Sequence, residues 1–390
     1  MAEGVWLEVA LNGPWTRQRQ PGIPVTRAER VEQAVACADA GAASGPLHAY
    51  DEGSGRPSEA YDLYAPVFEA IRSRRDVICY PTVPMGARPS QGPAEARARY
   101  EVVERLGRAG LIEWSVVDPG SVTLATFAEL RDGEDGFLYA NSASDVRIGL
   151  ELCGQHGLVP SYAIYEPGFL RTGAALRAAV PGSPSPVYRF MFSTAFTFGL
   201  PPTEWALDSY LRLLGASDPG APWMIAGLGV ELDGLWDAAM ARGGHLRVGL
   251  EDAPPGCTRT NAEMVAEACH AVQQAGRPLA TAAEVRRATV GSDPLPSART
   301  RRGARRSARR PGARDPRSGR GRPFRRRDHT PRAGVTGGRR AGVVVLRHGG
   351  SGARPGRASY PVSCSIQVGD VRSTAGRQRW GRARPGQRRA

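Results

Sequence analysis

One short segment of the chain places an arginine shortly before two adjacent carboxylates. Residues 243–252 read GGHLRVGLED, with Arg247 ahead of Glu251 and Asp252. If this is a strand, Arg247, Gly249 and Glu251 share one face and three aliphatic residues share the other. Because unpaired buried charges are costly, the charged face is poorly suited to core packing. At the mouth of a barrel it could meet a ligand or a metal ion, whereas at an ordinary strand end it would form a salt bridge.

A second segment ends in a residue that can bind metals. Residues 40–51 read AGAASGPLHAYD, so that small apolar residues lead to His48, which shares a strand face with Tyr50. A lone histidine is more often an ordinary structural residue than a ligand. Two strands that both end in possible metal ligands are better evidence, and they predict a joint site containing His48 and Glu251.

Short apolar runs alternate with amphipathic ones up to about residue 290. The strands that this pattern predicts are Trp6–Leu11, Ala42–Ala49, Val77–Thr82, Ile112–Asp118, Ser161–Tyr165, Val187–Ser193, Trp223–Gly227 and Leu246–Glu251. The predicted helices are Arg27–Ala40, Ala60–Arg74, Pro93–Ala109, Ser142–His156, Thr203–Leu214, Leu232–Arg242, Arg259–Ala275 and Ala282–Arg287.

Eight strand–helix repeats predict an α/β fold, a (β/α)8 TIM barrel over residues 1–292. Functional groups of such barrels lie at the C-terminal ends of the strands. The polar residues that fall at or near such ends are His48, Thr82, Asp118, Arg247 and Glu251. Periodicity alone leaves a doubly wound sheet as an alternative.

Taken together, these motifs resemble the beta-keto acid cleavage family, a zinc-dependent group that includes 3-keto-5-aminohexanoate cleavage enzyme. The supporting residues are ALNG at 10–13, the His48 segment with GRPS at 55–58, the segment 243–252 with Asn261, and then Ala280, Thr281 and Arg286. The resemblance extends from about residue 5 to about residue 290 and favours the barrel. The strand that ends in Glu-Asp is its most specific part.

The resemblance implies a zinc ion held by a His-x-His pair at the second strand and a Glu at the eighth. His48 and Glu251 would be metal ligands, Arg247 and Asp252 acid/base partners, and Thr82 a contact of the substrate carboxylate. The implied reaction condenses a β-keto acid with acetyl-CoA, the co-substrate, to give acetoacetate and a new acyl-CoA. A homo-oligomer, by resemblance a tetramer, is also implied.

The chain departs from this pattern at Pro46, where the first histidine of the pair should stand. Proline cannot bind zinc, so the predicted site is one ligand short. Three explanations are open: a single-base change, a low-affinity or inactive relative, or recruitment of Tyr50 or Asp51. The alternative function is therefore a catalytically impaired barrel that binds only a keto acid or acyl-CoA.

The C-terminal hundred residues differ in composition from the rest. Residues 291–390 contain 27 Arg and four Asp, a net charge of +23, so residues 1–290 carry −9 of the whole chain's +14. The Arg/Gly/Pro-rich stretch 293–390 lacks the apolar content of a core, which predicts a disordered tail. Such a tail can bind nucleic acid. Because the family resemblance ends near residue 290, a neutral extension or a frameshifted reading is favoured over that role.

Other classes of function receive less support. Metal-dependent barrel hydrolases place histidines on strands one, five and six, and the corresponding predicted strands contain none. No phosphate-binding glycine motif follows a strand. The six cysteines form no CxxC pair, and no apolar signal segment or 18-residue apolar stretch is present. These features predict a cytoplasmic protein with reduced thiols and no membrane association.

Overall fold

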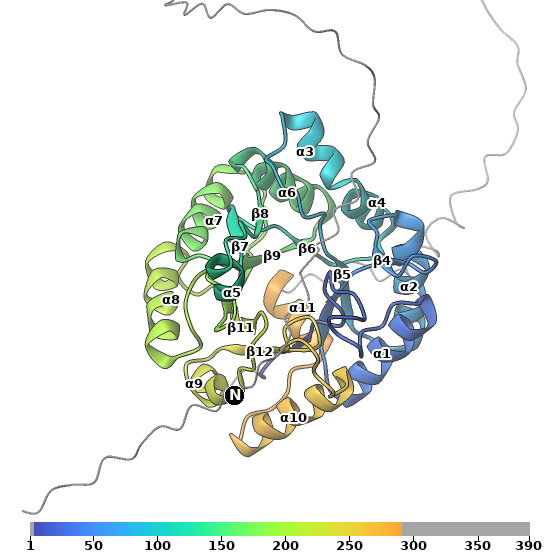
Figure 1. Ribbon diagram of the computed structural model, residues 1–390, viewed down its shortest axis with the longest axis vertical. Helices are drawn as coiled ribbons and strands as arrows, with labels where there is room; N and C mark the ends of the chain where they lie inside the picture. The colour runs from blue at the N-terminus through green and yellow to red at the C-terminus, as the bar shows by residue number, and fades with distance from the viewer. Residues whose placement is uncertain (1–3, 291–390) are drawn as a thin grey trace, which may run out of the picture. The chain divides into compact units, whose positions relative to one another are not determined.

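The centre of the protein is a barrel of eight parallel strands surrounded by helices (Figure 1). The computed structural model describes residues 4–290, and the predicted tail at 293–390 lies outside them. In barrel order the strands are β5 (Ile78–Pro81), β2 (Ser44–Leu47), β1 (Leu7–Val9), β12 (His245–Val248), β11 (Trp223–Gly227), β10 (Val187–Phe192), β9 (Val159–Ile164) and β6 (Trp114–Val116). The first and last of this order, β5 and β6, lie next to each other, so the barrel is nearly closed. The predicted TIM barrel is confirmed.

The outer helices follow the predicted pattern closely. They are α1 (Arg27–Ala40), α2 (Tyr61–Arg74), α3 (Pro93–Arg99), α4 (Glu101–Ala109), α6 (Ala143–His156), α7 (Pro167–Ala179), α8 (Glu204–Ser217), the 3-10 turn η1 (Asp233–Leu235) with α9 (Trp236–Ala241), α10 (Asn261–Gln274) and α11 (Ala282–Val290). None of these helices is both long and apolar enough to cross a membrane.

Local sequence explains where several of these helices begin and end. Thr26 and Glu29 form a capping box at the start of α1, and Gly41 ends the helix with a φ of +121°. The helix predicted over 93–109 is interrupted at Tyr100, which buries its ring against Gly149 of α6. The sequence analysis did not predict α7.

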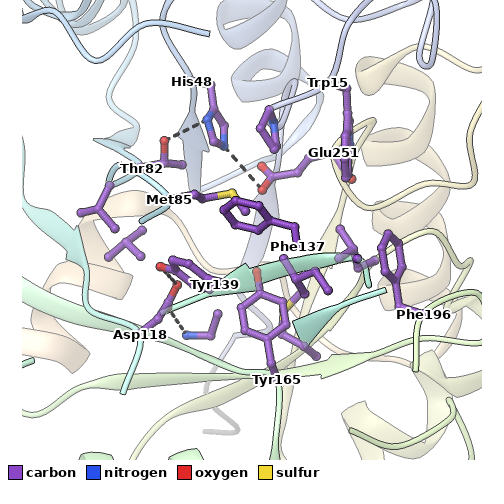
Figure 2. Close-up of a pocket in the computed structure, with 18 of the residues that line it drawn as sticks. Trp15, His48, Thr82, Met85, Asp118, Phe137, Tyr139, Tyr165, Phe196 and Glu251 are labelled. Carbon is purple, nitrogen blue, oxygen red and sulfur yellow. Dashed lines mark hydrogen bonds and ion pairs between the residues drawn. The ribbon is translucent and has the colours of Figure 1, made fainter. Parts of the chain in front are cut away.

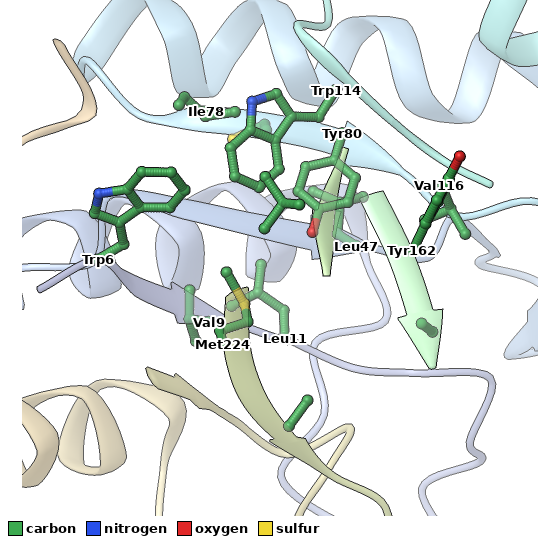
Figure 3. Close-up of a cluster of buried hydrophobic side chains, with 14 of the residues drawn as sticks. Trp6, Val9, Leu11, Leu47, Ile78, Tyr80, Trp114, Val116, Tyr162 and Met224 are labelled. Carbon is green, nitrogen blue, oxygen red and sulfur yellow. The ribbon is translucent and has the colours of Figure 1, made fainter. Parts of the chain in front are cut away.

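The barrel interior is filled by aromatic rings at its N-terminal end (Figure 3). The rings of Trp6 and Trp114 lie 6.4 Å apart, and Tyr80 lies 5.5 Å from Trp114. His245, the first residue of β12, stacks on Trp6 at 4.0 Å, so it belongs to this end of the barrel. The aromatic layer closes the bottom of the barrel and leaves room for a cavity at the other end.

Two short antiparallel elements are inserted at the C-terminal end of the strands. The larger follows β6 and consists of β7 (Val122–Leu124), α5 (Phe127–Arg131) and β8 (Phe137–Tyr139); we call it the 122–139 insertion. The smaller pairs β3 (Tyr50–Asp51) with β4 (Arg56–Pro57). Neither was predicted. The 122–139 insertion is fastened to the loop after β10, where the Phe127 amide donates to the Ala195 carbonyl at 3.1 Å and the Thr197 amide donates to the Ala125 carbonyl at 2.9 Å.

A glycine at the end of β12 sets the position of the predicted Glu-Asp pair. Gly249 has a φ of +136°, and a Cβ placed there would lie 2.2 Å from the Ala10 carbonyl oxygen. The same carbonyl accepts a hydrogen bond from the Glu251 amide at 3.1 Å. We therefore expect Gly249→Ala to lower the free energy of unfolding by about 3 kcal/mol, because strain and a backbone clash combine. Urea unfolding measures the change.

Gly243→Ala is the matched control for this prediction. Gly243 also has a positive φ, +81°, but no atom lies within 4 Å of an added Cβ. Its substitution should cost only the backbone strain, about 1 kcal/mol. Equal losses for the two variants would mean that the close approach between Gly249 and Ala10 does not matter.

Candidate active site

A cavity of about 370 Å³ opens at the C-terminal end of the barrel (Figure 2). Its polar lining includes His48, Thr82, Asp118, Arg247 and Glu251, each on or just after a barrel strand. Aromatic and apolar side chains form part of the remaining wall: Trp15, Met85, Phe137, Tyr139, Tyr165 and Phe196. The charged residues Arg19, Glu129, Glu134 and Asp135 also line it. Five residues were assigned roles in the site from the sequence, and the structure brings four of them to this cavity: His48, Thr82, Arg247 and Glu251. The fifth, Asp252, lies behind Arg247.

His48 is held from both its backbone and its ring. Asn12 Oδ1 accepts a hydrogen bond from the His48 amide at 2.9 Å, and Asn12 Nδ2 donates to the His48 carbonyl at 3.1 Å. Thr82 Oγ1 lies 3.0 Å from His48 Nδ1, which leaves Nε2 directed at Glu251 (Figure 2). Thr82 was predicted to contact a substrate carboxylate. In the structure it lines the cavity and also fixes the orientation of the imidazole.

The turn that carries Glu251 is anchored by three side chains, those of Trp15, Gln20 and Asn261. The strand was predicted to continue to Glu251, but it ends at Val248, because the backbone turns at the positive-φ residue Gly249 and the Asp252 amide donates to its carbonyl at 3.1 Å. The anchoring hydrogen bonds are Trp15 Nε1 to the Glu251 carbonyl (2.9 Å), Gln20 Nε2 to the Leu250 carbonyl (3.1 Å), the Leu250 amide to Asn261 Oδ1 (2.9 Å) and Asn261 Nδ2 to the Leu11 carbonyl (2.9 Å). The ALNG and Asn261 motifs therefore position the site.

Arg247 joins three carboxylates, of which those of Glu8 and Asp252 are buried and that of Glu251 is partly buried. Its Nε and Nη2 each donate to one oxygen of Asp252 at 2.8 Å, in a bidentate pair. Nη1 lies 3.3 Å from Glu8 Oε1, and Nη2 lies 3.3 Å from Glu251 Oε1. Burial alone would raise the pKa of Glu251, but the Arg247 guanidinium and His48 outweigh it and hold that pKa well below its usual range. Glu251 is therefore ionised at neutral pH.

Glu8 and Arg189 are charged residues of the site that the sequence analysis did not select. Glu8 is fully buried on β1, where it accepts a hydrogen bond from the Tyr80 hydroxyl at 2.6 Å. Arg189 lies on β10, with Nη1 3.8 Å from Glu8 Oε1. Each is a single charged residue inside an apolar run, WLEVAL or VYRFMF. That pattern was a usable signal, because an isolated charge on a central strand needs a partner inside the barrel.

Asp118 is held as an acceptor beside the cavity. Its Oδ2 accepts a hydrogen bond from the Tyr139 hydroxyl at 2.8 Å, and its Oδ1 accepts one from the Ala163 amide at 2.9 Å. Burial raises the pKa of Asp118, although Arg189 opposes the change. These hydrogen bonds link the ends of β6, β8 and β9, so Asp118 has a structural role beside the cavity.

We expect the stabilising effect of Asp118 to weaken as pH rises. Its folded-state pKa lies above the unfolded one, so the folded protein binds the proton more tightly and unfolding free energy falls as pH rises from the ordinary aspartate pKa to the raised one. Asp118→Asn lacks this titration. The stability of wild type relative to this variant, measured by urea unfolding, should therefore fall as pH rises from acidic to neutral values.

Asp39→Asn provides the control with the opposite sign. Asp39 is exposed, and its ion pair with Arg75 lowers its pKa. Any stabilisation it gives is present above the ordinary aspartate pKa and is lost as pH falls. A pH dependence of the same sign for the Asp118 and Asp39 variants would contradict the assignment.

The donor set beside the cavity does not match a complete catalytic zinc centre. Such centres use three protein ligands and leave a further position open. His48 Nε2 and Glu251 Oε1 lie 3.8 Å apart, and Pro46 lines the same cavity. Within residues 4–290, no three His, Cys, Asp or Glu side chains form a group that could hold a metal ion.

The two residues considered as replacement ligands are engaged elsewhere. The Tyr50 hydroxyl lies within hydrogen-bond distance of two carbonyl oxygens, those of Gly13 at 2.5 Å and Trp15 at 2.8 Å, and its single O–H donates to this pair. Asp51 Oδ1 accepts hydrogen bonds from the amide and hydroxyl of Ser54 at the surface. Recruitment of Tyr50 or Asp51 as the third ligand is therefore not supported.

Comparisons with known proteins agree on one family. The family model described as beta-keto acid cleavage enzyme matches residues 4–289. The chain is 26% identical over 294 residues to the 3-oxoadipate:acetyl-CoA acetyltransferase of Cupriavidus necator, covering 73% of this chain and 94% of that protein. It is 26% identical over 302 residues to the 3-dehydrocarnitine:acetyl-CoA trimethylamine transferase of Rhizobium meliloti, covering 74% and 96%.

Two further matches extend the comparison. The 3-keto-5-aminohexanoate cleavage enzyme of Fusobacterium nucleatum is 26% identical over 278 residues, with 70% of this chain and 92% of that protein covered. Among solved structures, the ternary complex of ObcA with a C4-CoA adduct and oxalate superposes with a TM-score of 0.56 at 17% identity, covering 69% of this chain and 67% of that one. At this identity, the structural match supports the barrel fold alone.

Proposed function

The chain belongs to the beta-keto acid cleavage enzyme family, and on that premise we propose that it transfers an acyl group between a β-keto acid and acetyl-CoA. In this reaction the CH2–COO⁻ unit of the β-keto acid joins the acetyl group of acetyl-CoA to form acetoacetate. The remaining acyl group becomes the thioester of the released CoA. The observation that carries the proposal is the convergence of His48, Thr82, Arg247 and Glu251 on one cavity within the matched region.

The residues of the cavity have properties that suit these steps. Glu251 is ionised and in contact with both His48 and Arg247, so it can hold the imidazole and the guanidinium in place beside a bound substrate. Arg247 stays protonated and offers positive charge where the enolate-like charge develops. Asp252 holds the guanidinium in place through the bidentate pair. Aromatic side chains of the cavity wall, among them Phe137 and Phe196, would shield a reactive carbanion from water.

Zinc dependence, which the family resemblance implies, stays a prediction. His48 and Glu251 would be its ligands, and a bound metal would act as a Lewis acid toward the substrate carbonyl. Because these two donors are one short of a catalytic set, no step of the proposed reaction is assigned to a metal.

Isotope labelling tests the proposed reaction directly. The full chain is incubated with acetyl-CoA labelled in its acetyl carbons and, in turn, with 3-oxoadipate, 3-keto-5-aminohexanoate and 3-dehydrocarnitine. We expect the label in acetoacetate and an unlabelled new acyl-CoA, both measured by mass spectrometry. Glu251→Gln should reduce kcat/KM by about 100-fold or more, whereas Glu267→Gln on α10 should not. Label in the new acyl-CoA would contradict the proposal.

A second candidate function rests on Pro46. A barrel without the third metal ligand can retain its cavity and bind a keto acid or acyl-CoA without cleaving it. Calorimetric binding of either compound, with no acetoacetate formed in the labelling experiment, would favour this candidate over the enzyme.

A further inference from the structure

Arg189 is a buried cation at the wall of the cavity. Arg189 is only 3% exposed, and it lies on β10 between barrel strands β9 and β11. The side chain lines the cavity together with Met191, two residues further along the same strand face. Its register partner on β9 is Ala163, which also lines the cavity and whose small side chain leaves space beside the guanidinium.

The hydrogen-bonding capacity of Arg189 is largely unused within the described residues. A guanidinium has five N–H donors in a planar fork. Arg189 Nη2 makes one long hydrogen bond, 3.4 Å, to the Ser161 carbonyl, and Nη1 lies 3.8 Å from Glu8, beyond hydrogen-bond distance. The buried Nε has no hydrogen-bond partner in residues 4–290. Burying charged donors without partners is costly, so a ligand that supplies acceptors would bind favourably.

In contrast to Arg189, the neighbouring Arg247 already uses its hydrogen-bond donors. Its donors already contact Asp252, Glu8 and Glu251. Both arginines approach Glu8, so they lie side by side in the barrel, one occupied by carboxylates and the other open. An anionic ligand that enters the cavity therefore finds available donors on Arg189. The other arginine of the cavity lining, Arg19, is less buried and stacks on Trp15, with 4.2 Å between its Cζ and the ring centroid.

We propose that Arg189 binds the carboxylate of the β-keto acid in the cavity. This inference rests on the proposed function for the identity of the ligand, while the open guanidinium itself is independent of it. A carboxylate accepts the parallel N–H groups of an arginine in a bidentate pair. Held in this way, the keto acid directs its adjacent methylene and carbonyl toward the polar groups of the cavity. Arg189 is thus a positioning and specificity residue for acids.

Binding of two matched ligands to the full chain tests the assignment. Acetoacetate and its methyl ester share the keto group and differ in the charge of the carboxylate. Titration calorimetry without CoA should show acetoacetate binding to wild type at least about tenfold more tightly than the ester. Arg189→Met keeps the length but removes the charge, and it should bring that preference close to one. Arg189→Lys should give an intermediate preference, because it keeps the charge but lacks the fork.

Arg177→Met is the matched control. Arg177 on α7 also has a buried Nε without a partner among the described residues, but it pairs with Asp218 and does not line the cavity. Its variant should keep the wild-type preference. Circular dichroism establishes that each variant folds, and if Arg189→Met does not, the lysine variant decides.

Two results would overturn the assignment: no preference in wild type, or an unchanged preference in the folded Arg189 variant. Tighter binding of inorganic phosphate than of acetoacetate would also overturn it. The proposed function fails separately. Preferential acetoacetate binding that depends on Arg189, with no labelled acetoacetate formed from acetyl-CoA, would leave Arg189 as a carboxylate-binding residue in a protein without transferase activity.

Discussion

Arg247→Met is expected to lower the free energy of unfolding by about 3–5 kcal/mol, since removing one member of a buried charge network leaves the others unpaired. Arg247 is 4% exposed and contacts three carboxylates, those of Glu8, Glu251 and Asp252. Without the guanidinium these groups repel one another in a medium that cannot screen them. Urea unfolding at neutral pH measures the loss.

Arg259→Met is the matched control for this large effect. Arg259 also pairs with two carboxylates, Glu231 and Glu267, but its side chain is 35% exposed. Surface ion pairs of this kind contribute at most about 1 kcal/mol. The destabilisation of Arg247→Met should also become smaller at acidic pH, where its unpaired carboxyls are protonated in the folded state. Similar losses of unfolding free energy for the two variants at neutral pH would contradict the prediction that burial makes the Arg247 network cost more to break.

Pro46→His is expected to raise the affinity for zinc by about 100-fold or more. Pro46, His48 and Glu251 line the same cavity, so a histidine on β2 would complete a set of three protein ligands. Even an outer-shell partner of a metal ligand is worth about 10–100-fold in affinity, and a direct ligand should exceed that. Zinc stoichiometry and competition with a chelator measure the change on the full chain.

The control is Pro57→His on the exposed strand β4, which adds a histidine away from the cavity. It should leave zinc affinity at the wild-type level. Near one tightly bound zinc per wild-type chain would contradict the prediction and show that the site is completed by a ligand other than position 46. A gain in both variants would indicate non-specific binding to added histidines.

The barrel was predictable because its local signals agree with its tertiary structure. Each of the eight strand segments was found, and α1 was placed at its exact bounds, since its capping box and terminal glycine are visible in the sequence. The 122–139 insertion was missed. Its strands have three residues each and partly exposed apolar side chains such as Leu138, so neither length nor alternation identified them. In α7 an opening Pro-Gly pair is typical of a turn, and this obscured the helix.

The candidate site was predicted at its strand ends but not at its centre. His48, Thr82, Arg247 and Glu251 follow from the motifs, and the structure brings them together. The charge network was not predicted, because pairing between Glu8 and the arginines depends on barrel closure and not on sequence spacing. The turn at Gly249 came earlier than expected for a similar reason, because it depends on the close approach of Gly249 to Ala10, which directly follows the neighbouring strand β1.

The hydrogen bonds between the 122–139 insertion and the loop after β10 have a consequence for engineering. The insertion supplies Phe137 to the cavity wall and the other loop supplies Phe196, while Thr126 and Phe196 form a β-bridge between them. If only one of these loops were replaced by a loop from another barrel, the backbone hydrogen bonds between the 122–139 insertion and the loop after β10 would be lost. Changing which acyl chains enter the cavity therefore requires that both loops be replaced together, as one unit.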